Sequence, residues 1–131
     1  MVDKKRFYKI LIAEDEHFIL SMYSKKFKKE GFNVEEACDG EEAWRKVESF
    51  NPDVLLLDIS MPKKSGIEVL KSIRKEEKFD KLIIVMLTNF GEREYMEKTL
   101  NEGANDFLVK SSLNPSEIVE EVKKKLLFKN N

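Results

Sequence analysis

The sequence predicts a single α/β domain in which a parallel sheet is covered by helices on both faces. Short apolar runs such as Ile10–Ala13 and Val54–Leu57 are typical of parallel strands that are buried on both sides. Segments with the periodicity of strands alternate five times with segments of helical periodicity, and the connections between them are short. The length of 131 residues suits one domain.

Two strand–helix units are predicted in the first half of the chain. A buried strand over residues 9–13 is followed by a helix that stops at Gly31. Residues 32–37 should form a shorter and more polar strand, as expected at the edge of a sheet. Asp39 is the predicted N-cap of the second helix, and we expect Trp44 in that helix to be a core residue.

The middle of the chain repeats the same pattern. A third buried strand over residues 54–58 ends in a carboxylate, where the chain must leave the core. Ser65 and Glu68 match the Ser-x-x-Glu capping box, so they should mark the start of a third helix. A fourth buried strand is predicted over residues 82–87.

The last part of the chain contains two further helices with a short strand between them. Asn89 and Glu92 can cap a fourth helix, which should be rather exposed because it carries few large apolar residues. The short fifth strand is predicted over residues 106–109. Asn114, followed by proline and then by Glu117, has the pattern that begins a helix.

Composition and charge exclude several functional classes. The 24 basic and 25 acidic residues leave a formal net charge of -1, which provides no electrostatic basis for binding nucleic acid. The apolar stretches are far shorter than the ~20 residues of a membrane span, and the first residues lack the apolar core of a signal peptide. We therefore expect a soluble, cytoplasmic protein. Cys38 is the only cysteine, so neither an intrachain disulfide nor a zinc-binding cysteine cluster can form.

Polar residues follow four of the predicted strands and should converge at one edge of the sheet. Glu14 and Asp15 follow the first strand, Asp58 ends the third, Thr88 follows the fourth and Lys110 follows the fifth. Three carboxylates at a half-buried edge repel one another and require a positive partner. Because all of these ligands are oxygens, a hard cation such as Mg²⁺ is favoured. A metal, a lysine and a hydroxyl around an aspartate suit the transfer of a phosphoryl group to a carboxylate.

These positions together resemble the receiver domain of two-component response regulators, and the resemblance covers essentially the whole chain. It rests on Glu14-Asp15, Asp58 with Pro62 and Gly66 downstream, Thr88, and the segment Gly-Ala-Asn-Asp-Phe-Leu-Val-Lys at 103–110. The resemblance implies a flavodoxin-like (βα)5 fold with a five-stranded parallel sheet in the order 2-1-3-4-5.

The resemblance also implies a function. Asp58 would accept a phosphoryl group from the phosphohistidine of a histidine kinase in a magnesium-dependent reaction, with Thr88 and Lys110 binding the phosphoryl oxygens. The protein would then be a phosphoacceptor signalling protein that assists its own phosphorylation and dephosphorylation, and not an enzyme acting on a separate substrate. The implied magnesium ligands are the side chains of Glu14, Asp15 and Asp58 and the backbone carbonyl of Ser60.

The family further implies a switch and partners. Thr88 and Phe107 would be the switch pair, although Phe107 is equally compatible with a permanently packed core residue. We expect a histidine kinase or phosphotransfer protein on one side. Downstream, we expect a separate target protein that docks on the fourth helix, fifth strand and fifth helix. We expect neither nucleic acid nor a membrane among the partners. Residues 1–131 are predicted to be one stand-alone receiver with a core over about 7–128, without an output domain, as a monomer or weak dimer.

Three residues depart from the family pattern and leave alternatives open. Glu14 stands where aspartate is commoner, Asn89 where a small residue is usual, and Ser111 where the family has a proline joined by a cis bond. The main alternative is therefore a pseudo-receiver, an interaction module that acts independently of phosphorylation. A hydrolase of the haloacid dehalogenase type would need a second aspartate at the position of Ser60. His17 is interpreted as a solvated residue at the start of a helix.

Overall fold

The computed structural model describes residues 7–89 and 93–130, and its centre is a parallel sheet in the order β2-β1-β3-β4-β5. This order confirms the prediction. The strands are β1 (Lys9–Ala13), β2 (Asn33–Ala37), β3 (Val54–Asp58), β4 (Ile83–Thr88) and β5 (Asp106–Val109).

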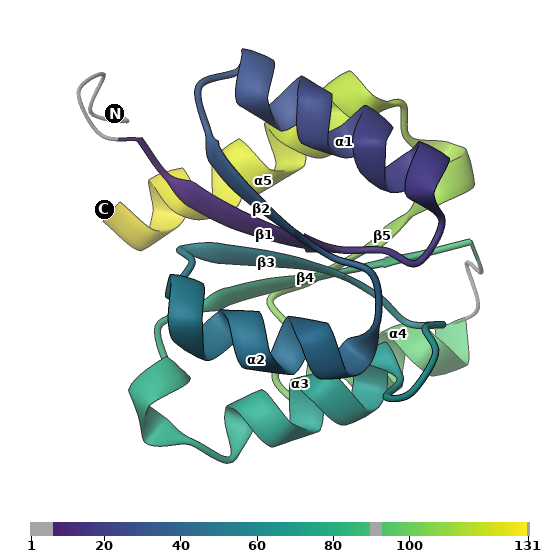
Figure 1. Cartoon of the computed structure of the whole chain (residues 1–131). Coiled ribbons are helices and arrows are strands. Elements are labelled where there is room, and N and C mark those ends of the chain that lie inside the picture. The colour runs from purple at the N-terminus through teal and green to yellow at the C-terminus, as the bar shows by residue number, and fades with distance from the viewer. Residues whose placement is uncertain (1–6, 90–92, 131) are drawn as a thin grey trace.

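Helices cover both faces of this sheet (Figure 1). One face carries α1 (His17–Lys29) and α5 (Pro115–Asn130), which contact each other. The opposite face carries α2 (Gly40–Phe50), α3 (Gly66–Arg74) and α4 (Arg93–Asn101). Within the described part of the chain, no helix combines the length and the apolar character needed to cross a membrane.

Two hydrophobic clusters fill the space between the sheet and its helices. Alternate side chains of each strand point to opposite faces, so neighbouring residues such as Leu55 and Leu56 belong to different clusters. Every residue of β3 and β4 is buried, whereas β2 exposes or half-exposes four of its five residues. The edge position predicted for the polar second strand is therefore confirmed.

Side-chain caps begin the helices where the sequence predicts them. The side chains of Asp39, Ser65 and Asn114 each accept a hydrogen bond from the amide three residues on, at 2.8, 3.2 and 2.9 Å. Glu117 completes the last cap, because its carboxylate accepts the amide hydrogen of Asn114 at 3.0 Å. The cap predicted from Glu92 lies outside the described residues. The fourth helix, as expected, buries little: only Thr99 among its residues is fully buried.

The second and fourth strands each begin one residue later than predicted, for the same physical reason, and the fourth also ends one residue later, at Thr88. The amide of Phe32 donates to Phe27 O at 3.0 Å, and the amide of Leu82 donates to Phe79 O at 3.0 Å. Both residues therefore close the preceding turn and do not pair with a neighbouring strand. Their apolar side chains made them resemble strand residues in the sequence.

Trp44 is less buried than predicted for a core residue. Trp44 is half-buried at the rim of the cluster between the sheet and α2. Its ring packs edge-on against Phe79 with centroids 6.4 Å apart, and Lys64 Nζ lies 5.1 Å from its centroid. Phe79 belongs to a short 3-10 helix, Glu77–Phe79, that the sequence did not predict. An indole at the rim can contact an apolar ring and a cation at the same time.

Arg74 at the end of α3 holds several loops together, a role that the sequence did not reveal. Its guanidinium donates to the carbonyls of Gly103, Phe79 and Leu82 at 2.8, 3.0 and 2.8 Å. It also donates to Asn105 Oδ1 at 3.0 Å, the atom that accepts the amide hydrogen of the β4 residue Ile84 at 2.7 Å. These contacts connect α3 and the start of β5 to β4.

A close backbone approach fixes the beginning of α3 against the end of β3. The amide of Gly66 donates to Ile59 O at 2.8 Å. A Cβ atom at position 66 would lie 2.0 Å from the backbone oxygen of Asp58. Only glycine allows this contact, so the glycine positions the strand end that carries Asp58.

We predict that Gly66→Ala lowers the free energy of unfolding by about 3 kcal/mol or more, because the added methyl group would lie 2.0 Å from the Asp58 carbonyl oxygen and the backbone would have to shift. Gly31→Ala is the matched control, since position 31 has a positive φ but no atom within 4 Å. The control should lose only about 1–2 kcal/mol, the cost of a left-handed alanine. Urea unfolding of both variants measures the difference, and equal losses would contradict the proposed collision.

Candidate functional site

The register of the strands brings the predicted site residues to one edge of the sheet. Ala13 pairs with Leu57, so Glu14 and Asp58 follow them side by side at the ends of β1 and β3. Thr88 pairs with Val109, which places Lys110 directly beyond the end of β5. Strand pairing alone therefore assembles the constellation.

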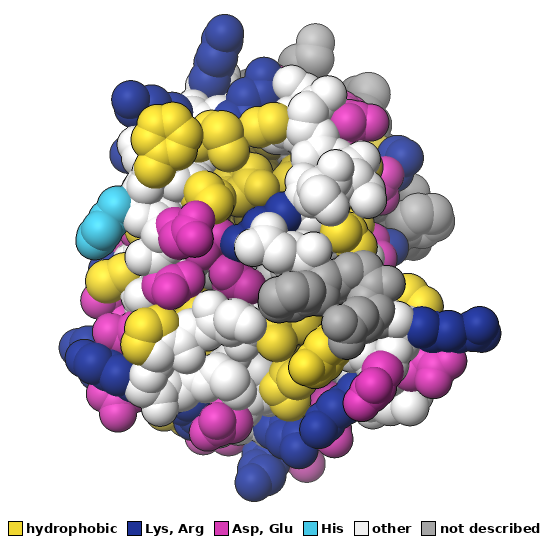
Figure 2. Space-filling view, turned by 90° about the vertical axis from the view of Figure 1, so that its right-hand side faces the viewer, with side chains coloured by type: hydrophobic (Ala, Val, Ile, Leu, Met, Phe, Trp, Pro, Cys, Tyr) yellow, Lys and Arg dark blue, Asp and Glu magenta, His cyan; other side chains and the backbone are white. Residues whose placement is uncertain are grey.

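These residues line a pocket of about 260 Å³ at the carboxyl edge of the sheet. Figure 2 shows this edge, where acidic side chains gather beside recessed basic side chains and below a hydrophobic area. All predicted metal, phosphoryl and acceptor positions line the pocket, together with Glu16, which the sequence analysis did not assign a role. The lining residues are Glu14, Asp15, Glu16, Asp58, Ser60, Thr88, Asn89 and Lys110.

Lys110 is held between two carboxylates. Its Nζ lies 2.9 Å from Asp58 Oδ2 and also donates a hydrogen bond to Glu14 Oε1. The side chains of Lys110, Glu14 and Asp58 are only 8%, 1% and 8% exposed. Burial disfavours the charged ammonium, but the hydrogen bonds to the two carboxylates outweigh it and raise the pKa of Lys110. The lysine therefore remains a cation in the buried site.

Both oxygens of Glu14 have partners in this arrangement. Glu14 Oε1 accepts from Lys110, and Oε2 accepts the amide hydrogen of Glu16 at 3.3 Å. Burial raises the pKa of Glu14 in spite of its bond to the lysine, and the negative charge of Asp58 adds to that rise. Burial likewise raises the pKa of Asp15, with a further contribution from Glu14. The positive charge of Lys110 alone therefore does not balance the three carboxylates.

Asp58 is oriented by contacts on both of its oxygens. Oδ1 accepts the amide hydrogen of Ser60 at 3.2 Å, and Oδ2 accepts from Lys110. The residue is 6% exposed, and Thr88 on the neighbouring strand is 1% exposed. A carboxylate held at the floor of an open pocket can meet a reactant that approaches from the solvent side.

The residues at this edge fit a hard divalent cation. One carboxylate oxygen from each of Glu14, Asp15 and Asp58 lies within 4.8 Å of the others. Oxygen ligands from two or three carboxylates are what Mg²⁺ prefers, and a dication offsets the repulsion between them.

Three further positions from the sequence analysis have clear places in the structure. Phe107 is half-buried, packs against the cluster beneath α2, α3 and α4, and does not line the pocket. The Lys110–Ser111 peptide bond is trans, and residues Lys110–Ser112 form a short 3-10 helix. Asn89 is exposed at the pocket mouth.

Comparison with known proteins agrees with this fold and site. The sequence profile of the response regulator receiver domain matches residues 10–123. The chain is 33% identical over 117 residues to the chemotaxis protein CheY of Thermotoga maritima, with 88% of this chain and 95% of CheY covered. It is 36% identical over 123 residues to the alkaline phosphatase synthesis transcriptional regulatory protein PhoP of Bacillus subtilis, covering 84% of this chain and 50% of PhoP. The chain thus spans about half the length of the first curated relatives it matches.

One solved structure with the same fold is a complex that contains BeF3 and magnesium. The chain aligns with a TM-score of 0.82 and 32% identity to a chain of the CheX-CheY-BeF3-Mg complex of Borrelia burgdorferi, covering 91% of this chain and 89% of that one. Sheet order, acidic site and sequence matches lead to the same result. This chain belongs to the family of response regulator receiver domains, the signalling domains of two-component systems.

Proposed function

We propose that this chain is a receiver that accepts a phosphoryl group on Asp58 from the phosphohistidine of a histidine kinase or phosphotransfer protein. The observation that carries the proposal is the buried carboxylate of Asp58, held 2.9 Å from Lys110 inside a cluster of three acids. Phosphoryl acceptance and magnesium binding in the acidic pocket are general features of receiver domains.

Phosphoryl transfer needs an oxygen of Asp58 that the donor can reach from the pocket. A carboxylate oxygen of Asp58 attacks phosphorus, a P–O bond forms, and the P–N bond to the imidazole breaks. Lys110 already contacts Asp58 and offsets charge on a transferred phosphoryl oxygen. Thr88, at the end of the adjacent strand, donates its hydroxyl hydrogen to another. Asp15, Asp58 and the carbonyl of Ser60 would hold Mg²⁺, which would offset the remaining charge on the phosphoryl oxygens.

Glu14 has a separate part in this proposal. Its Oε1 accepts a hydrogen bond from Lys110 and its Oε2 from the Glu16 amide, so Glu14 positions the lysine. Its contact to a bound Mg²⁺ would run through water. The Glu14 side chain, which is longer than that of the aspartate common in the family, thus holds the Lys110 ammonium group beside Asp58.

The proposed signal is read at α4, β5 and α5 by a separate target protein. This surface lies next to the site, because Lys110 directly follows β5 and Thr88 pairs with the last residue of β5. Leu100 on α4 is 41% exposed, and Lys125 of α5 lies 3.4 Å from Asp106 at the start of β5. A movement of β5 would therefore be transmitted to both neighbouring helices.

We predict that beryllofluoride with magnesium shifts the amide signals of Asp58, Thr88 and Lys110, and that Asp58→Asn abolishes these shifts. Asp80→Asn is the control, because Asp80 is exposed beside the 3-10 helix that precedes β4. A wild-type spectrum that stays unchanged at saturating magnesium and beryllofluoride would reject phosphoacceptance. That result would leave the phosphorylation-independent interaction module as the function.

Lys110→Met should have opposite effects on the two ligands of the site. Magnesium should bind more tightly, because a competing cation is gone, whereas beryllofluoride should bind at least about tenfold more weakly. Without magnesium, the free energy of unfolding should fall by about 3–5 kcal/mol, since Glu14 keeps a buried charge without its partner. Lys124→Met on the exposed side of α5 is the control. Calorimetric titration and urea unfolding measure these effects, and unchanged stability without magnesium would contradict the charge balance.

The switch hypothesis predicts that the Phe107 ring changes rotamer when beryllofluoride binds. Thr88→Ala should retain part of the beryllofluoride affinity but lose the response of the ring, because the hydroxyl that would move toward the phosphoryl mimic is absent. Aromatic NMR spectra report the ring, with the buried Phe79 as an internal reference. A Phe107 ring with one rotamer in both states would show that it is a fixed packing residue.

A further inference from the structure

The loop between β3 and α3 has one unusual backbone conformation. Lys63 has a φ of 69°, a left-handed value that residues other than glycine rarely adopt. This conformation lets the amide of Lys64 donate to Pro62 O at 2.7 Å. The loop spans residues 59–65 and includes Ser60, whose carbonyl is a proposed magnesium ligand.

Both ends of this loop are fixed by the phosphoacceptor strand. At the start, the amide of Ser60 donates to Asp58 Oδ1 at 3.2 Å. At the end, the amide of Gly66 donates to Ile59 O at 2.8 Å. The direction of the Ser60 carbonyl therefore depends on the conformation of the few residues between these two anchors.

The turn between β2 and α2 contacts the middle of the loop. The amide of Gly40 donates to Pro62 O at 3.3 Å. A Cβ atom at position 40 would lie 1.7 Å from Lys64 O, so the two backbones approach more closely than any side chain allows. Asp39 and Lys63 add an ion pair at 3.5 Å, but the lysine side chain is 60% exposed and contributes little.

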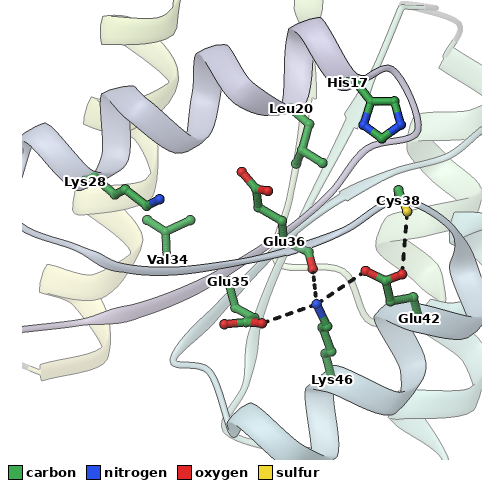
Figure 3. A pocket seen from close by; sticks show the side chains of 9 residues that line it. All are labelled: His17, Leu20, Lys28, Val34, Glu35, Glu36, Cys38, Glu42 and Lys46. Atoms are coloured by element: carbon green, nitrogen blue, oxygen red, sulfur yellow. Dashed lines mark hydrogen bonds and ion pairs between the residues drawn. The ribbon is translucent and has the colours of Figure 1, made fainter.

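The turn itself is held in place from its other side (Figure 3). Lys46 Nζ donates to Glu36 O at 2.6 Å and pairs with Glu35 and Glu42 at 3.2 and 3.3 Å. Cys38 Sγ lies 3.5 Å from Glu42 Oε2. These contacts join the end of β2 to the first turns of α2, so the turn between them is a firm support for the loop.

We infer that the Gly40 turn and the left-handed Lys63 are positioning elements that aim the Ser60 carbonyl into the magnesium site. This inference rests on the proposed function, because it assumes that magnesium binds beside Asp58. A loop that leaves this conformation binds the metal only in the fraction of molecules where the carbonyl is in place, so its apparent affinity falls.

Lys64 provides a way to observe the loop directly. Its Nζ lies 5.1 Å from the centroid of Trp44 and donates to Ser72 Oγ at 2.7 Å. Trp44 is the only tryptophan of the chain. Its fluorescence therefore reports whether the loop keeps its place on α2.

The test compares Lys63→Gly with Lys63→Val. Both variants lose the ammonium group, but glycine adopts the left-handed conformation freely, whereas valine strongly resists it. We expect Lys63→Gly to bind magnesium nearly as the wild type does, and Lys63→Val to bind about tenfold more weakly. Magnesium titrations followed by the Ser60 amide signal give the affinities, and Trp44 fluorescence gives the loop position. Equal affinities in the two variants overturn the inference.

A second pair of variants separates positioning from general stability. Gly40→Ala should weaken magnesium binding and change Trp44 fluorescence, because its methyl group displaces the loop. Gly31→Ala destabilises a position with no neighbouring atom within 4 Å and should leave the magnesium affinity unchanged. If Gly40→Ala matches Gly31→Ala in magnesium affinity, the positioning role is overturned. If the wild type binds no magnesium at all, the proposed function fails together with the inference.

Discussion

The contact of Lys110 with Glu14 and Asp58 is the interaction on which the site depends. Two carboxylates that are almost fully buried would repel each other and lose their hydration, and the lysine offsets both costs. The lysine reaches them only because β5, β4, β3 and β1 end at the same edge of the sheet. The strand order thus explains how acids from the first half of the chain meet a cation from its last part.

One lysine does not balance three acids, and this deficit defines the chemistry of the pocket. Asp15 adds negative charge beside Asp58, and burial raises its pKa. A divalent cation bound among the carboxylates would relieve this repulsion. The same pocket therefore suits a divalent cation, and in the proposed reaction the phosphoryl group would lie beside it and contact Lys110.

The sequence predicted most elements correctly because local chemistry determines them. Alternating periodicities located every strand within one residue, and Asp39, Ser65 and Asn114 cap the helices as their residue types suggest. The burial of Trp44 was overestimated, because the spacing of apolar residues along a helix does not show which of them lie at the rim of the sheet. Arg74 was missed, since two of its partners, Gly103 and Asn105, lie 29 and 31 residues further along the chain.

By itself, the sequence determined which side chains stand at the strand ends, because apolar periodicity and the residue that follows each run are local properties. Only the tertiary structure decided their pairing. Lys110 meets Glu14 across 96 residues and Asp58 across 52, and it leaves Glu14 with both oxygens engaged. Likewise, only the folded chain shows that Gly40 touches the loop after Ser60. Such contacts depend on the register of strands and the approach of backbones, which no local pattern encodes.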